Sequence, residues 1–118
     1  MIMETERYRI EGRVLIVKDG VSSIEEDEFK DMVKIREVRF PDGLTWIWDY
    51  AFSGCVKLKK IQFPYTMERI CRSAFSGCKG LKEVVVPSNT KIDEHAFDGC
   101  DALEKVIIRD VKPVSTAK

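Results

Sequence analysis

Apolar and polar residues alternate with period two in short segments that recur along the chain. In residues 60–63, Ile61 and Phe63 alternate with Lys60 and Gln62, and Pro64 follows. This pattern predicts a short strand with one inward face, which the proline ends. A second alternating stretch at residues 68–71 predicts another short strand that buries its isoleucine. Residues 73–75 then predict a single-turn helix or a 3₁₀ corner, which a glycine lets the chain leave sharply.

The whole unit is repeated. The segment Ala51–Cys55 returns at Ala74–Cys78 and at Ala96–Cys100, so its phenylalanine recurs after 23 and then 22 residues. Each copy continues with a leucine and then with the alternating strand. One step further back, Phe29 marks a degenerate copy, and another step reaches residues 15–24. The repeat therefore covers almost the whole sequence, and its period lies in the range of roughly 20–29 residues that is typical of leucine-rich repeats.

The pattern A-F-x-G-C-x-x-L-x-x-[I/V]-x-[I/L/F/V]-P resembles the BspA-like class of leucine-rich repeats over residues 15 to 110. The copy at residues 28–32 departs from it, and Arg109 replaces the proline of the earlier copies. The resemblance implies a right-handed coil of stacked turns that binds proteins or surfaces, with no catalytic residue to transfer. The fold class that we expect is therefore α/β, a leucine-rich-repeat solenoid with stacked parallel short strands and helical or 3₁₀ corners.

We expect one domain over residues 1–118, because a single turn is too small to fold alone. Columns of phenylalanine and isoleucine side chains from successive turns are predicted to form the core. Residues 8–17 read as two strands around Glu11 and Gly12, a β-hairpin that caps the N-terminal end. The expected divisions are a cap and half repeat at 8–27, repeats at 28–50, 51–73, 74–95 and 96–110, and a tail at 111–118.

Composition and charge narrow the possible partners. The 118 residues contain 20 Lys and Arg against 20 Asp and Glu, so no net positive charge favours nucleic acid or an anionic membrane. No run of eighteen apolar residues is present, and the first seven residues lack the apolar stretch of a secretion signal. We therefore expect no membrane insertion and a cytoplasmic protein. A piece cut from a longer secreted or cell-surface protein has the same appearance.

The cysteines occupy a structural position. Cys55, Cys78 and Cys100 share one place in the repeat, which predicts a buried column. The sequence has no C-x-x-C pair and a single histidine, so we expect no metal site and no cofactor. Cys71 lies outside the column, and the repeat places His95 one turn away. A nucleophilic cysteine–histidine dyad is a remote alternative to a half-exposed structural cysteine.

Two outward-facing rows of the predicted strands carry distinct chemistry. One row alternates in sign along the stack, through Glu37, Lys60, Glu83 and Lys105, and a self-neutralised surface is its simplest interpretation. The next row becomes apolar towards the C-terminus, at Val85 and Ile107. An apolar patch of this kind is covered either by the tail or by a second molecule, which makes a homodimer possible.

An aromatic pair is the other candidate site. Ile47 is the inward residue of its strand, so period-two alternation sends both Trp46 and Trp48 outwards. The corresponding positions of the next turn hold Arg69 and Cys71. A cation–π contact between Trp46 and Arg69 is one interpretation, and an anchor for a partner is the other. Trp46, Trp48, Arg69, Val85 and Ile107 are thus the predicted partner-binding residues.

Three classes of function follow. The first is a non-catalytic scaffold that presents a leucine-rich-repeat surface to a protein partner. The second is a fragment of a cell-surface adhesin that binds a host or matrix protein. A cysteine-dependent enzyme is a distant third. The sequence does not name the partner, because repeats of this kind bind through whatever side chains they display.

Overall fold

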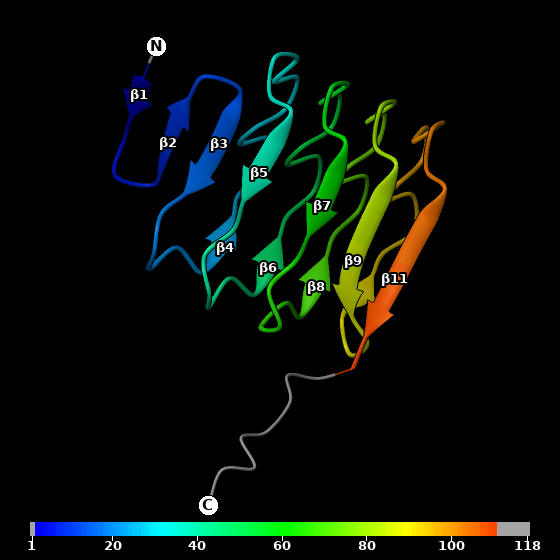
Figure 1. Cartoon of the computed structure of the whole chain (residues 1–118). Helices are drawn as coiled ribbons and strands as arrows, with labels where there is room; N and C mark the ends of the chain where they lie inside the picture. The colour runs from blue at the N-terminus through cyan, green and yellow to red at the C-terminus, as the bar shows by residue number, and fades with distance from the viewer. Residues whose placement is uncertain (1, 111–118) are drawn as a thin grey trace, which may run out of the picture.

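The chain forms a β-solenoid of about four turns in which short strands stack on one another (Figure 1). A computed structural model describes residues 2–110. The strands are β1 (Ile2–Glu4), β2 (Tyr8–Glu11), β3 (Val14–Val17), β4 (Ser23–Ile24), β5 (Glu37–Arg39), β6 (Trp46–Ile47), β7 (Lys60–Gln62), β8 (Arg69–Ile70), β9 (Glu83–Pro87), β10 (Lys91–Ile92) and β11 (Lys105–Arg109).

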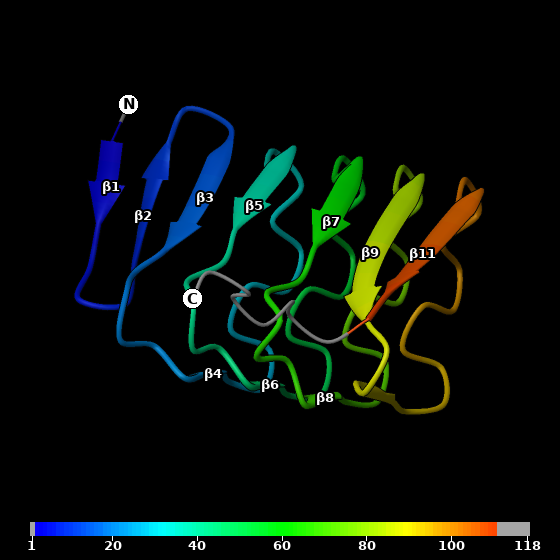
Figure 2. The ribbon, with the colours of Figure 1, turned by 60° about the horizontal axis from the view of Figure 1, so that its bottom comes forward.

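The strands lie on two separate faces of the coil, as Figure 2 shows from below. One face carries β3, β5, β7, β9 and β11, and the other carries the two-residue strands β4, β6, β8 and β10. Strands of successive turns pair in parallel, because each turn brings the chain back to the same face in the same direction. On the first face, β5 pairs with β3 and β7 pairs with β9, so this face consists of two hydrogen-bonded sheets.

The strand pairing follows the repeat. Leu15 lies opposite Val38, and Ile61 lies opposite Val84, a spacing of 23 residues in each case. Val84 lies opposite Val106 and Ile70 opposite Ile92, a spacing of 22 residues. The shortening falls between Val86, which is still aligned with Phe63, and Ile92. The register predicted from the repeat is therefore the register of the structure.

The predicted helical or 3₁₀ corners are not confirmed. The described residues contain no helix, so the α/β class is not confirmed. The amide of Ser76 bonds along the chain to the carbonyl of Ser73 (3.1 Å), but the amides of Phe75 and Gly77 bond to the next turn, at Ala96 and Asp98 (2.8 and 2.7 Å). Positive φ angles at Ser73 (55°) and Gly77 (73°) also interrupt any right-handed helix.

Stacked aromatic rings fill the interior. The phenylalanine column runs with centroid distances of 5.3 Å (Phe29 to Phe52), 5.0 Å (Phe52 to Phe75) and 5.4 Å (Phe75 to Phe97). The isoleucine column is fully buried at its first three members, Ile24, Ile47 and Ile70. Its fourth member, Ile92, is 42 % exposed because no further described turn covers it. The two predicted columns are thus present, and both become exposed at the C-terminal end.

The N-terminal end carries the expected antiparallel hairpin, with Ile10 of β2 opposite Leu15 of β3. The structure adds a third strand, β1, which pairs antiparallel with β2 and which the sequence pattern did not predict. The ring of Tyr8 makes an edge contact with Phe29 (centroids 5.0 Å apart) and so covers the first ring of the column. The three strands β1 to β3 therefore close this end of the core. The predicted tail at 111–118 lies outside the described residues.

Candidate interaction surface

The two tryptophans lie on the outer side of the face made by β4, β6, β8 and β10. Strand β6 places Trp46 opposite Ser23 on one side and opposite Arg69 on the other. Its inward residue, Ile47, is fully buried. The rings of Trp46 and Trp48 contact each other, with centroids 4.9 Å apart and planes inclined by 33°. The predicted alternation is thus present, and it brings both rings together on one surface.

Trp46 is held by its own chain. The guanidinium of Arg69 lies 5.5 Å from the centre of the Trp46 ring, so the predicted cation–π contact is present. The indole Nε1 donates to a carboxylate oxygen of Glu68 (3.3 Å). Arg69 is itself fixed by Asp93, to which its nitrogens donate at 2.9–3.1 Å. Trp46 is consequently only partly exposed, and its orientation is set by three neighbours.

Trp48 is the more exposed of the two tryptophans, with 41 % of its surface accessible to solvent. Its backbone amide bonds to the carbonyl of Ile24 (2.9 Å), which puts Glu25 beside it in the same row of the preceding turn. In the following turn the same row holds Cys71. Glu25 is a neighbour that the sequence analysis missed, although the 23-residue repeat places residue 25 next to residue 48, and its carboxylate accepts from the Ser23 hydroxyl (2.5 Å).

The apolar patch predicted at Val85 and Ile107 is present only in part. Val85 is 6 % exposed and so is not part of an open surface, because β9 has a strand on each side and Val85 lies between Gln62 and Ile107 in its row. Ile107 is exposed (38 %), in agreement with the prediction. Its neighbours Val106 and Ile108 are more exposed still, at 53 % and 59 %. The exposed apolar surface therefore lies on β11 alone and includes its inward row.

The cysteine column is present, with Cys55 and Cys78 buried and Cys100 partly exposed, and it has a specific role. Each thiol donates to the backbone carbonyl of the phenylalanine in the preceding turn: Cys55 to Phe29, Cys78 to Phe52 and Cys100 to Phe75, all at 3.2 Å. Burial raises the pKa of the Cys55 thiol to about 11. The Cys55 thiol therefore remains a protonated hydrogen-bond donor at neutral pH.

Cys71 does not have the features of a nucleophile. It is 3 % exposed, not half-exposed as expected, and it lies between Trp48 and Asp93 in its row. Burial, together with the negative charges of Asp93 and Asp49, raises the pKa of Cys71 to about 11. A catalytic thiol needs a lowered pKa. His95 points to a different partner, since its Nδ1 bonds to Asp98 (2.5 Å).

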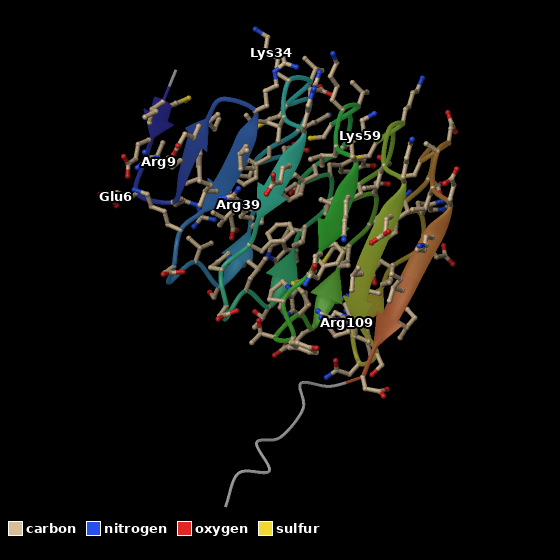
Figure 3. The ribbon with its side chains drawn as sticks, in the orientation of Figure 1. Glu6, Arg9, Lys34, Arg39, Lys59 and Arg109 are labelled. Carbon is tan, nitrogen blue, oxygen red and sulfur yellow. The ribbon has the colours of Figure 1, made fainter. Side chains whose placement is uncertain are left out.

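Some of the alternating charges on the face made by β5, β7, β9 and β11 form ion pairs. Lys60 lies 3.1 Å from Glu83, and Lys105 lies 4.0 Å from the same carboxylate. Glu37 instead bonds to Arg39 of its own strand (2.8 Å). Figure 3 shows Arg39 on β5 and Arg109 at the end of β11, both on this strand face. Exposed pairs of this kind contribute little to stability, which agrees with a self-neutralised surface.

Comparison with known proteins settles the family. The family model of the BspA type leucine rich repeat region, in six copies, matches residues 10–116. The chain belongs to the BspA-type leucine-rich-repeat family. This BspA-type chain has no significant match among curated proteins. Its described residues include no helix long and apolar enough to cross a membrane.

Solved structures of leucine-rich-repeat proteins resemble the BspA-type solenoid closely. A leucine rich cell surface protein from Faecalibacterium prausnitzii is 25 % identical over 81 % of the chain, with a TM-score of 0.71. A leucine-rich repeat protein from Bacteroides ovatus is 27 % identical over 81 % of the chain (TM-score 0.71). The leucine rich repeat protein of T. pallidum is 27 % identical over 80 % (TM-score 0.67). The chain spans 32 %, 30 % and 58 % of these three proteins, respectively.

Proposed function

We propose that the chain is a non-catalytic scaffold that binds a protein partner through the tryptophan surface, meaning Trp46, Trp48 and Arg69. The observation that carries this proposal is the exposure of Trp48 beside a second ring that its own chain holds in place. A rigid aromatic side chain on a fixed sheet loses little conformational freedom on binding, and tryptophan and arginine are enriched among residues that dominate binding energy. The repeat family supports a scaffold, since its turns differ mainly in the side chains that they display.

Binding is tested by capture of proteins from lysate and envelope extract of the source cells on the immobilised chain. We expect a protein that the wild type retains and that the Trp46→Ser, Trp48→Ser double variant loses, with its binding then reproduced using the purified partner. The matched control is Tyr65→Ser, which removes an aromatic ring on another face, where Arg109 lies over it. Equal retention by the double variant and the wild type, with both folded, contradicts the proposal.

A cell-surface adhesin is the second candidate. The resemblance to a cell surface protein of similar fold favours it, and the same tryptophan surface serves either function. A cytoplasmic location has no support from the comparisons. Capture of a protein from the envelope extract or from host matrix, and not from the cytosolic lysate, favours the adhesin.

Self-association is a further candidate for the C-terminal end. Within residues 2–110, β11 pairs with β9 along one edge and with no strand along the other, and the apolar residues Val106, Ile107 and Ile108 are exposed. An open strand edge next to exposed core residues favours pairing with another chain. We propose a homodimer through this end.

A further inference from the structure

Trp48 is the one exposed large apolar residue of the described chain that an open end does not explain. Ile2, Met3 and Val33 lie at the N-terminal end, where Met3 and Val33 line one apolar hollow with Ile10. Ile92 and the apolar residues of β11 lie at the C-terminal end. Trp48 lies in the middle of the stack, with a turn on either side of it. Its exposure therefore belongs to the surface of the solenoid and not to its ends.

The cation position over this ring is free. Within residues 2–110, cations lie over Tyr50, Trp46 and Tyr65, supplied by Lys30, Arg69 and Arg109, respectively, and none lies over Trp48. Arg69 cannot shift to it without leaving Asp93, which holds it through two nitrogens. Trp48 therefore presents an aromatic face that attracts a positive charge from outside the chain.

The charges around the ring have one dominant sign. The tryptophan face, comprising residues 22–28, 45–51, 68–74 and 90–96, has eight acidic residues against three Lys and Arg, whereas the whole chain is neutral. The acidic residues are Glu25, Glu26, Asp27, Glu28, Asp49, Glu68, Asp93 and Glu94. Glu28 and Asp93 are neutralised by Arg7 and Arg69. A negative potential therefore remains on this face.

Two acidic residues are neighbours of Trp48 in the fold, and the carboxylate of one of them, Glu25, also accepts a hydrogen bond from the Ser23 hydroxyl. Glu25 lies beside it in the preceding turn, and Asp49 follows it in the chain and is close enough to Cys71 to affect its pKa. An aromatic ring between carboxylates suits a lysine or arginine side chain, because the ring binds its cationic head and the carboxylates accept its hydrogen bonds. The same charges repel phosphate groups and acidic peptides.

On these grounds we propose that the tryptophan face binds a basic protein segment and places one lysine or arginine side chain on Trp48, between Glu25 and Asp49. This inference rests on the proposed scaffold function and names the chemistry of its partner. The rest of the segment lies along β6 and β8, over the ring of Trp46, where further basic residues meet the remaining negative charge.

The test uses the intrinsic fluorescence of the full chain, since both of its tryptophans are in the proposed site. The probe is a synthetic peptide, Ac-GGKGGKGGKGG-amide, titrated at low ionic strength. We expect a saturable change in tryptophan emission, with a Kd that rises on addition of salt because exposed charges are screened. The same peptide with acetylated lysines is expected to bind at least about tenfold more weakly, since acetylation removes the charge.

Matched variants locate the contact. Glu25→Gln combined with Asp49→Asn keeps both tryptophans and is expected to weaken peptide binding by about tenfold or more. Glu104→Gln removes an exposed carboxylate in the last turn and is expected to leave the Kd within about twofold of the wild type. Trp48→Leu is expected to abolish the emission change, while circular dichroism shows an intact fold.

Three outcomes overturn the inference. The first is no saturable binding of the lysine peptide, and the second is equal binding of the acetylated peptide. The third is a saturable response to a neutral oligosaccharide such as cellohexaose that exceeds the response to the peptide, which would make this face a sugar-binding surface. The proposed function fails separately, by equal retention of partners by the Trp46→Ser, Trp48→Ser variant.

Discussion

The cysteine of each repeat shows how a small side chain links two turns. Its thiol donates to the carbonyl of the phenylalanine one turn earlier, and this contact is made three times in the described chain. The carbonyl would otherwise be buried with one acceptor site unused, which is unfavourable in an apolar interior. The cysteine and phenylalanine positions of the repeat are therefore coupled across the stack.

Phe75 is the residue whose loss is expected to be most damaging. It is fully buried and lies between two stacked rings, Phe52 at 5.0 Å and Phe97 at 5.4 Å. Phe75→Ala is expected to lower the free energy of unfolding by about 3–5 kcal/mol through lost burial and the cavity left behind. Thermal unfolding measures this as a fall in Tm of more than about 10 °C.

The exposed Val33 provides the control for that measurement. Val33→Ala changes a side chain that is 49 % exposed, so its effect is expected to stay within about 0.5 kcal/mol. A thermal midpoint for Phe75→Ala as high as that of Val33→Ala would show that the phenylalanine column does not stabilise the fold.

At the corners, four equivalent residues adopt a backbone conformation that the sequence did not predict. Asp27, Tyr50, Ser73 and His95 hold the same place in successive turns, and all have positive φ angles between 55° and 66°. This conformation is unfavourable for residues other than glycine, and the four residue types have no obvious feature in common. At Asp27 and Tyr50 the amide bonds to the neighbouring turn, at Asp49 and Arg72 (3.2 and 3.1 Å), and no local sequence pattern predicts such contacts.

At the scale of single elements, the N-terminal hairpin is tied to the first corner by one ion pair. Arg7, in the loop between β1 and β2, donates to both carboxylate oxygens of Glu28 (2.8 and 2.9 Å) and to the carbonyl of Ser23 (2.8 Å). The amide of Glu25 donates to the same carboxylate (2.9 Å). This cluster therefore links the cap to the solenoid at the entrance to the tryptophan face.

The bond between Arg7 of the cap and the Glu28 carboxylate makes the free energy of unfolding depend on pH. Burial opposes ionisation of Glu28, but the hydrogen bonds from Arg7 and the Glu25 amide outweigh it and lower the pKa of Glu28 below its ordinary value of 4.5. A lowered folded-state pKa stabilises the protein above the unfolded-state pKa, and this contribution is lost as the pH falls through the folded-state value. Glu28→Gln is therefore expected to be less stable than the wild type at pH 7, with the difference shrinking towards about pH 3.

Urea unfolding at the two pH values measures this difference. Glu26→Gln is the control, because Glu26 is exposed and makes no ion pair within the described residues. It is expected to match the wild type closely at pH 7. If the stability gap between Glu28→Gln and the wild type is the same at pH 7 and pH 3, the ionised carboxylate is not what holds the cap.

At the scale of the whole molecule, the two ends of the solenoid differ. The hairpin covers the N-terminal end, whereas the last described turn leaves Ile92, Val106 and Ile108 exposed. An exposed apolar surface next to an open strand edge favours association. If β11 forms a dimer contact, Val106→Lys combined with Ile108→Lys is expected to convert the dimer into the 13.6 kDa monomer, because the added charges resist burial.

Sedimentation velocity over a range of concentrations distinguishes these states. Ser22→Lys combined with Gln62→Lys is the control, since it adds two positive charges at exposed residues that do not pair with β11. It is expected to dimerise as the wild type does. A wild-type chain that stays monomeric at every concentration removes the case for this contact.

The sequence predicted the parts of the molecule that depend on periodicity. The strand pairing, the phenylalanine and cysteine columns, the hairpin and the outward placement of both tryptophans all follow from the 22- or 23-residue period and from alternation within strands. The exposure of individual side chains depends on their neighbours in three dimensions. Cys71 and Val85 were expected at the surface for that reason, although adjacent turns bury them.

The single shortened repeat has a consequence for engineering. The segment between Val86 and Ile92 is one residue shorter than its counterpart in the preceding turn, yet the strands before and after it keep their alignment. This corner therefore accommodates a change in chain length, so an added loop or label inserted here leaves the columns in place. One residue added within β7 would instead reverse the inward and outward sides of the residues that follow in that strand. The solenoid is thus expected to tolerate an insertion at this corner but not within its strands.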